Sequence, residues 1–224
     1  MVISKWLTIP FTIHHSPFTI HLRTEHMMLK TLFALLLISV AGIAQTTDPK
    51  PFPIDNNHST VGFSVPILNG LSKVHGKFTD FAITLNHDEK DITKSSVTVV
   101  IKPASIDTGI EGRDKHLRSA DFFDVEKYPE IKFVSSRVEK KGKSFIAYGT
   151  LTMHGVSKDI ALPFSITGTN TDPTGKKKNI GYSARMTLNR RDYGINWTHQ
   201  TAPNFVGDNI DIEIDLITRA IAVN

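Results

Sequence analysis

Residues 145–166 read FIAYGTLTMHGVSKDIALPFSI and contain two runs in which the side chains alternate in character. The first run places apolar or small residues at the odd positions from 145 to 153, and the second places apolar residues at the even positions from 160 to 166. A period of two is typical of strands that bury one face. The stretch therefore predicts two amphipathic β-strands, with a turn near His154.

The same alternation occurs on both sides of this stretch. It is found over residues 61–67, 74–85, 97–101, 131–133, 182–188 and 210–216. Between residues 74 and 85 the apolar parity changes near Thr79–Asp80, which predicts a β-bulge within one strand. Together these runs predict an all-β domain with eight antiparallel strands. We expect an extended barrel, because closure removes exposed sheet edges, and a two-sheet sandwich is the alternative.

One insert interrupts the strands. Residues 110–123 are rich in charged and aromatic side chains, and their apolar residues recur at helical spacing. Pro129 marks the start of the next strand, because the residue before a proline is held in an extended conformation. The sequence predicts a short helix here that covers one end or one side of the barrel.

The first 53 residues are not expected to belong to the barrel. Residues 27–44 combine a basic start at Lys30 with a short apolar run and small residues up to Ala44, which is typical of a secretory signal peptide. Residues 1–26 then read as an upstream over-extension of the reading frame, and residues 45–53 as a linker. A single domain is predicted over residues 54–219, and we expect it to be periplasmic.

The composition excludes several kinds of chemistry. The chain has no cysteine, so thiol catalysis, disulfides and thiolate metal sites are excluded. A formal net charge of +4 with interspersed signs is not typical of nucleic-acid binding. The basic run at 176–178 lies beside Pro173 and Gly175, so it is interpreted as a solvated hairpin tip.

Residue patterns for catalysis are weak. Asp107-Thr108-Gly109 matches the aspartic-protease tripeptide, but that chemistry needs two carboxylates, and the sequence has one copy. No two histidines of the predicted domain lie at helical i,i+4 spacing, and there is no HExxH motif. We therefore predict no catalytic residue, no metal site and no cofactor.

Several motifs occur in one order along the chain. They are DNNHS at 55–59, VGFSV at 61–65, VHGKF at 74–78, TGIEGRDKHLRSADFFDVEKYPEIKFVSS at 108–136, GTLTMHGVSK at 149–158, NRRDYG at 189–194 and GDNI at 207–210. In these motifs the chain resembles the YceI-like family over residues 52–218. The resemblance implies a lipocalin-like eight-stranded barrel in the periplasm, with a polyisoprenoid or similar long apolar lipid held in the lumen.

The strand pattern then gives candidate ligand-binding residues. The candidates for an apolar wall are Phe63, Val65, Phe78, Phe81, Phe133, Phe164 and Trp197. The candidates for a polar or anionic head group at the mouth are Arg113, His116, Arg190 and Arg191. The first two are chosen for the placement of the insert, and the last two for their position in a predicted hairpin, where arginine can bind such groups bidentately. In the alternative interpretation, Arg113, Asp114 and Asp192 hold the helix on the barrel by ion pairs.

Three functions are compatible with these features. The first is a carrier that holds a polyisoprenoid, an isoprenoid quinone or a fatty-acid derivative in the barrel lumen. The second is a stress-related interaction module with a filled barrel that binds a membrane-associated redox partner. The third is a lipid-modifying enzyme that uses His116 or Asp114. A homodimer is compatible with all three, and the sequence does not separate a hollow barrel from a filled one.

Overall fold

A computed structural model of the chain describes residues 51–223. The expected over-extension, the signal peptide and most of the linker lie outside these residues. The described part is one antiparallel sheet of eleven strands. The strands are β1 (Thr60–Ile67), β2 (Ser72–Phe78), β3 (Phe81–Asn86), β4 (Ser96–Ile101), β5 (Ile106–Asp107), β6 (Ile131–Lys141), β7 (Ser144–Met153), β8 (Val156–Thr171), β9 (Lys177–Asn189), β10 (Asn209–Ile217) and β11 (Ile221–Ala222).

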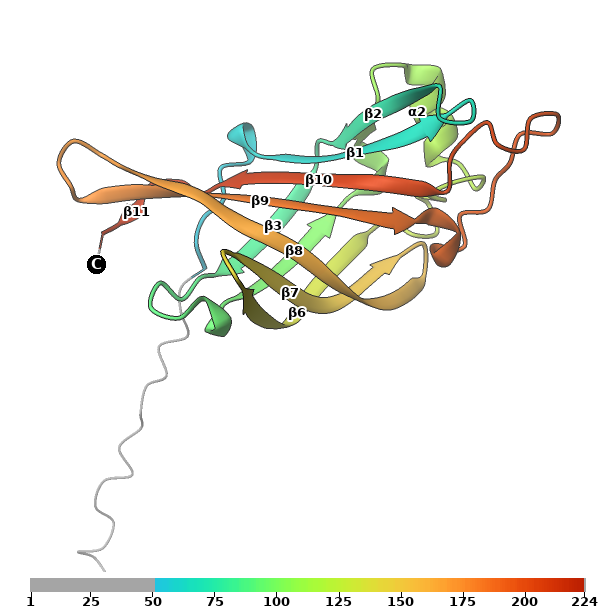
Figure 1. The fold of residues 1–224 in the computed structure, drawn as a ribbon. Coiled ribbons are helices and arrows are strands. Elements are labelled where there is room, and N and C mark those ends of the chain that lie inside the picture. Colours follow the sequence, from blue (N-terminus) through green and yellow to red (C-terminus); the bar gives the residue numbers. More distant parts are fainter. Residues whose placement is uncertain (1–50, 224) are drawn as a thin grey trace, which may run out of the picture. The chain divides into compact units, whose positions relative to one another are not determined.

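The sheet is strongly curled into the predicted lipocalin-like barrel (Figure 1). The strand order is β3-β4-β6-β7-β8-β9-β10-β1-β2-β5, and β11 pairs with the outer part of β9. Strand β1 pairs with β10, so the first and last long strands of the domain lie side by side. The all-β class is confirmed, whereas the prediction of eight strands was wrong.

The difference in strand number has a structural cause at residues 79–80. The sequence predicted one bulged strand over 74–85, but the chain turns a corner there. Strand β2 pairs with β1 and β5, whereas β3 pairs with β4. The two halves therefore lie at opposite ends of the strand order, and the chain between them joins those ends. A change of parity has the same appearance in sequence whether a strand bulges or bends sharply.

The long hairpins β6–β7 and β7–β8 contain two backbone features that shape the barrel. The turn between β7 and β8 consists of His154 and Gly155, both with positive φ (51° and 76°), which is the conformation that two-residue hairpins require. The register of β6 against β7 shifts between Ser135 and Arg137. At that bulge a Cβ on Gly149 would lie 2.2 Å from the carbonyl oxygen of Val134, so the close approach of the two strands requires glycine.

The predicted helical insert is present and is shorter than expected. Helix α2 covers Glu111–Arg118, and residues 119–123 form a turn rather than more helix. Four short 3-10 turns accompany it: η1 (Asn56–His58), η2 (Ile92–Lys94), η3 (Pro103–Ser105) and η4 (Arg190–Tyr193). Helix α2 lies at one end of the barrel, which also carries the β1–β2 turn and the loop between η4 and β10 (Figure 1). We call this end the α2 end.

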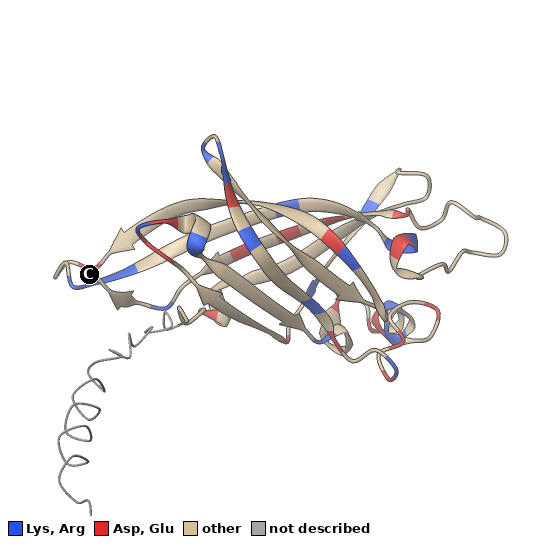
Figure 2. Cartoon of the chain, turned by 90° about the horizontal axis from the view of Figure 1, so that it is seen from below, with Lys and Arg blue, Asp and Glu red and all other residues tan. Residues whose placement is uncertain are grey.

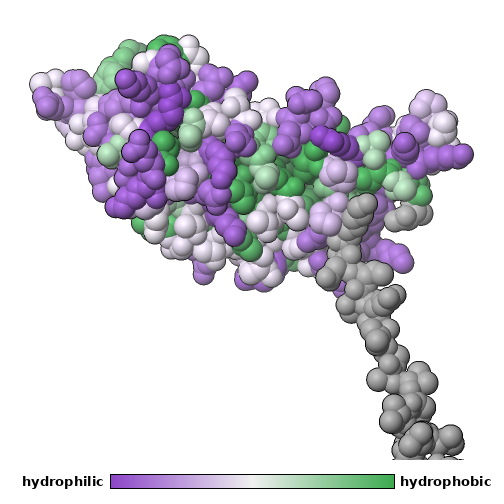
Figure 3. All heavy atoms as spheres, turned by 180° about the vertical axis from the view of Figure 1, so that it is seen from behind, coloured by the Kyte–Doolittle hydropathy of each residue, from purple (hydrophilic) through white to green (hydrophobic). Residues whose placement is uncertain are grey.

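The inward faces of the strands form the core. Charged residues are spread along the strands and turns (Figure 2), and of the described Lys, Arg, Asp and Glu residues only Asp114 and Arg190 are buried. The larger hydrophobic cluster extends from Val61 on β1 to Ile195 after η4, and the smaller one contains Ile54, Leu85, Ile180 and Tyr182. From behind, hydrophobic surface is visible along the middle of the molecule and at the α2 end (Figure 3). Within residues 51–223, no helix is long and apolar enough to cross a bilayer.

Candidate functional site

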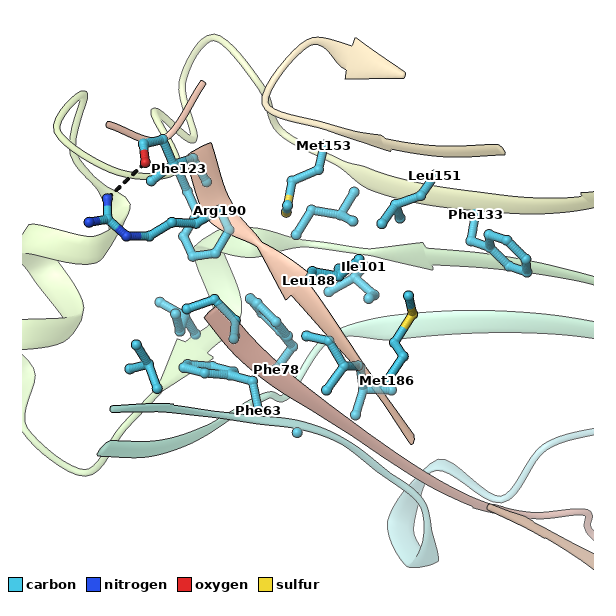
Figure 4. A pocket seen from close by; sticks show the side chains of 18 of the residues that line it. Phe63, Phe78, Ile101, Phe123, Phe133, Leu151, Met153, Met186, Leu188 and Arg190 are labelled. Atoms are coloured by element: carbon cyan, nitrogen blue, oxygen red, sulfur yellow. Dashed lines mark hydrogen bonds between the residues drawn. The ribbon is translucent and has the colours of Figure 1, made fainter. Parts of the chain in front are cut away.

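The barrel interior contains a cavity of about 160 Å³. Its wall is almost wholly apolar and is built from strands on both sides of the barrel, from α2 and from the loops beside it (Figure 4). The strands contribute inward-facing residues such as Phe78, Ile101 and Met186. The α2 end contributes Leu117, Phe122 and Phe123. The hydrophobic alternation of the strands, rather than any polar motif, therefore creates this site.

A second cavity of about 70 Å³ lies next to the first. The two share Val99, Leu162 and Ile214 in their walls, so they follow one another along the lumen. The second cavity is lined at its other end by His87 and Tyr182. The barrel interior thus contains two adjoining apolar cavities within a packed core.

Cavities of this size and polarity hold hydrocarbon rather than water. An engineered apolar cavity of about 150 Å³ in another protein stays dry and binds benzene. The larger cavity here is comparable, and the second extends the space along the barrel. A water molecule there would lack the two to four polar partners that it needs. The two cavities therefore suit an apolar segment of a ligand rather than a polar group.

Arg190 is the one ionisable residue in the wall of the larger cavity, and its side chain is 4 % exposed. Its guanidinium donates to the carbonyl oxygens of Ile195 at 2.8 Å and Gly207 at 3.1 Å, and it lies 2.9 Å from Asp208. Burial lowers the pKa of Arg190, and the charge of Asp208 opposes that shift. The guanidinium is thus occupied by protein groups and fixes the loop from η4 to β10.

His87 and Tyr182 define the opposite end of the lumen, which we call the far end. The Tyr182 hydroxyl lies 3.2 Å from Nδ1 of His87, and both side chains are buried. Burial lowers the pKa of His87 and raises that of Tyr182, because in each case the charged form would be desolvated. A neutral, hydrogen-bonded pair therefore lines the lumen at this end.

Polar side chains at the start of α2 hold the helix in place. Asp114, which is buried, accepts from the backbone nitrogen of Thr108 at 3.0 Å and from its hydroxyl at 2.5 Å. Arg113 donates to the Thr108 hydroxyl and to its carbonyl oxygen, each at 2.7 Å. Asp192 instead lies 3.5 Å from Lys158. The helix is therefore held by hydrogen bonds to Thr108. The alternative prediction, in which Arg113, Asp114 and Asp192 hold the helix by ion pairs, was wrong.

His116 lies one side chain away from the cavity. Its Nε2 is 2.7 Å from Asp121, and its ring contacts the edges of Phe122 and Trp197. Phe122 lines the cavity, so it separates His116 from the lumen. His116 and Asp121 are both part-exposed. This hydrogen-bonded pair therefore lies next to the apolar wall, with Phe122 between it and the cavity.

The predicted site residues divide between the lumen and its surroundings. The larger cavity is lined by Phe63, Val65, Phe78, Phe133 and Arg190, and the smaller one by Phe164. Phe81 is buried in the core but lines neither cavity, and Trp197 packs on Phe122 outside them. Arg113, His116 and Arg191 lie outside the lumen, where Arg191 pairs with Asp208 at 2.8 Å. Contact of these residues with a ligand remains a prediction.

The sequence reasoning missed the aliphatic and methionine part of the wall. It comprises Ile101, Leu151, Met153, Ile160, Leu162, Met186, Leu188, Ile210, Ile212 and Ile214. These residues have the same inward parity as the chosen phenylalanines, so the alternation itself was the signal. Methionine is suited to such a wall, because its flexible thioether adapts to ligands of irregular shape.

The other motifs are structural. The Asp107 carboxylate accepts from the backbone nitrogen of Gly109 at 2.9 Å, and Gly109 has a φ of 80°, so Asp-Thr-Gly forms a turn. In the part of the chain that the structure describes, no group of three or more His, Cys, Asp or Glu residues is placed to hold a metal ion.

These features define a class: a curled antiparallel barrel with a helix at one end and an apolar lumen that contains two adjoining cavities. A family model described as the YceI-like domain matches residues 52–218. The chain belongs to this family. A UPF0312 protein of Photorhabdus laumondii is 37% identical over 171 residues, which are 75% of this chain and 88% of the relative. A UPF0312 protein of Serratia proteamaculans is 38% identical over 173 residues, with 75% and 88% coverage.

Solved structures agree with the fold. BcnA of Burkholderia cenocepacia aligns with a TM-score of 0.66 at 20% identity, covering 74% of this chain and 99% of that one. The YceI protein of Campylobacter jejuni aligns with a TM-score of 0.58 at 31% identity, covering 69% and 87%. A polyisoprenoid-binding domain of Saccharophagus degradans aligns with a TM-score of 0.56 at 13% identity, covering 76% and 99%.

Proposed function

We propose that this protein binds a long apolar lipid, of the polyisoprenoid, isoprenoid-quinone or fatty-acyl type, in the barrel lumen. The observation that carries the proposal is the pair of adjoining apolar cavities of about 160 Å³ and 70 Å³. Transfer of apolar ligand surface from water into this wall gains roughly 25 cal/mol per Å². The name of the Saccharophagus degradans domain, which binds polyisoprenoid, supports the same class of ligand.

The lumen favours binding over catalysis. The ionisable group in the wall of the larger cavity, Arg190, is held by carbonyl oxygens and by Asp208. A polar head group would therefore remain at the α2 end, where His116 and Asp121 lie beside Phe122. The hydrocarbon tail would extend past Val99 toward Tyr182.

We further propose that the protein acts as a carrier in the periplasm. The pattern of residues 27–44 supports export, because it has the basic start, short apolar run and small residues of a signal peptide. The absence of cysteine makes the fold independent of the redox state of that compartment. A lipid in the lumen would be shielded from the water that it has to cross.

The test compares neighbouring residues on the two faces of β6. Phe133 is 5% exposed and lines the cavity, whereas Val134 is 42% exposed on the outer face. Protein from a membrane-containing host is analysed by native mass spectrometry, followed by organic extraction of any added mass. We expect about one apolar molecule per chain in the parent and in Val134→Asp, and none in Phe133→Asp.

A second variant covers the case in which Phe133→Asp does not fold. Met186 lines the cavity and is part-exposed, so Met186→Trp fills space without burying a charge. We expect a folded protein with the bound lipid reduced about tenfold or more. A parent protein without adduct after incubation with isoprenoids and fatty acids would overturn the proposal, as would undiminished loading of folded Met186→Trp.

A further inference from the structure

Two segments that are far apart in the sequence form one projection at the α2 end. The β1–β2 turn lies against the loop that precedes β10: the backbone nitrogen of Leu68 donates to the carbonyl oxygen of Phe205 at 2.9 Å, and that of Asn69 donates to Asn204 at 3.3 Å. Ile67 and Val206 form an isolated β-bridge. We call residues 66–72 and 195–207 together the apolar tip.

The apolar tip exposes leucines in a conformation that folding does not require. Leu71 is 83% exposed and Leu68 is 45% exposed. Leu68 and Asn69 both have positive φ (52° and 55°). Such turns favour Asn-Gly or Asp-Gly, and a bulky residue in the left-handed region costs about 1–2 kcal/mol. Leu71 is thus almost fully solvated, and Leu68 is partly solvated in a strained conformation, so apolar surface of both side chains is available to a partner.

The apolar tip also lacks charge, in a chain in which 21% of the residues are charged; its exposed apolar surface comes from Leu68 and Leu71, whereas the loop at residues 198–204 is polar and uncharged. Residues 66–72 read PILNGLS and residues 195–207 read INWTHQTAPNFVG. Both segments are uncoloured by charge in Figure 2, where the long loop extends furthest from the barrel. Directly behind the tip, Lys77 is exposed on β2, and so is Lys73, which pairs with Asp211 at 2.9 Å. An uncharged apex with lysines behind it matches a bilayer, whose apolar region lies below a layer of phosphates.

A row of aromatic side chains connects the apolar tip with the cavity. The ring centroids of Phe122 and Trp197 are 5.2 Å apart, those of Trp197 and His199 are 6.2 Å apart, and those of His199 and Phe205 are 5.3 Å apart. Phe122 lines the cavity, and so does Val206, the neighbour of Phe205. Aromatic residues with a polar edge favour the membrane–water interface. The row thus extends from the lumen to the proposed contact.

We propose that the apolar tip docks on a phospholipid bilayer by inserting Leu68 and Leu71, which places the α2 end of the lumen against the membrane. The inference rests on the proposed function, because a carrier of insoluble lipid has to exchange its ligand at a lipid surface. At this surface the lumen is covered by apolar side chains of α2 and the loops, such as Leu117 and Phe123, while Arg190 and the Ile67–Val206 bridge hold the loop before β10. The far end carries the buried Tyr182 pair instead.

The experiment measures co-sedimentation of the full-length protein with vesicles of phosphatidylethanolamine and phosphatidylglycerol. The variants are Leu68→Asp and Leu71→Asp, and the control is Val134→Asp, which places the same charge on the outer face of β6. We expect vesicle binding of the parent and of the control, and a loss of about tenfold or more in each tip variant, since burying one leucine is worth about that factor.

Three outcomes would overturn the inference: no vesicle binding by the parent, equal binding by folded tip variants, or equal loss in the control. A parent dimer that Leu71→Asp separates in the absence of vesicles would assign the apolar tip to a contact between two copies instead. Lipid extracted from the same samples separates the two proposals. If the parent contains lipid but does not bind vesicles, only the docking proposal is contradicted. If the parent contains no lipid, the proposed function is contradicted.

Discussion

The two ends of the lumen are built in different ways. At the far end, His87 and Tyr182 are buried and hydrogen-bonded to each other; Tyr182 lies on β9, which pairs with β8 and β10, and His87 follows the terminal strand β3. At the α2 end, the cavity is bounded by side chains of a helix and of loops, including Leu117 and Phe123. Opening the far end would break the buried contact between His87 and Tyr182. At the α2 end, Arg190 and Asp114 hold the loop and the helix, so an opening there would come from the apolar side chains that cover the cavity. We infer that the ligand enters at the α2 end.

The largest expected effect concerns the polar frame of the α2 end. Arg190→Met leaves the carbonyl oxygens of Ile195 and Gly207 and the carboxylate of Asp208 without their buried partner. We expect the free energy of unfolding to fall by about 3 kcal/mol, because several acceptors lose their hydrogen bonds to one buried charged donor. Urea denaturation monitored by circular dichroism measures it.

The matched control is the next residue. The side chain of Arg191 is 38% exposed and pairs with the same Asp208. Arg191→Met should lower the free energy of unfolding by less than about 1 kcal/mol, because water replaces an exposed partner. Equal losses in the two variants would show that the loop is not held by Arg190.

A smaller effect is expected at the far end. Tyr182→Phe removes the hydroxyl that contacts His87 and should lower the free energy of unfolding by about 1 kcal/mol, the usual contribution of one hydrogen bond. Tyr193→Phe at the α2 end serves as the comparison. Tyr193 is 2% exposed, and within residues 51–223 the structure shows no hydrogen bond from its hydroxyl. Thermal denaturation that ranks Tyr193→Phe as the more harmful change would contradict the proposed role of the far-end pair.

The smallest effect is a pH dependence at the far end. Burial lowers the pKa of His87 below its ordinary value of 6.5, while Glu89 and Asp88 raise it and Lys178 lowers it further. Below pH 6.5 the unfolded chain binds a proton more readily than the folded one. The contribution of His87 to stability is therefore complete above pH 6.5 and is lost as the pH falls toward the folded pKa.

The measurement is the free energy of unfolding of the parent and of His87→Phe between about pH 5 and pH 8. The parent should lose stability on acidification relative to the variant, and the curves should run parallel above pH 6.5. Parallel curves over the whole range would mean that His87 titrates equally in both states.

The sequence predicted the architecture well wherever strands alternate plainly. The hairpin from Phe145 to Ile166 was predicted from its two runs, and the insert before Pro129 was recognised from its helical spacing. The corner at residues 79–80 was not, because a bulge and a bend shift the parity in the same way. Strands β5 and β11 have two residues each, which is too short for a periodic signal.

The sequence predicted which side chains of the candidate site point into the barrel, but not how far along the barrel axis each one lies. Parity places Phe78 and Phe81 in the interior, yet only Phe78 lines the cavity. Depth depends on how far along the barrel a residue lies, and that is set by strand register. Arg190 and Arg191 were likewise equivalent in sequence, and the 3-10 turn η4 determines which of them is buried.

The pairing of β1 with β10 determines when the barrel can form. Thr60 is opposite Asp215, so the first long strand has to wait for one of the last parts of the chain to be synthesised. Until then its free edge and the inward face of the sheet are exposed, and such long-range pairings fold slowly. A chain that ends before residue 209 would expose the apolar inner face of an incomplete sheet. The domain is therefore most prone to aggregation just before β10 is added.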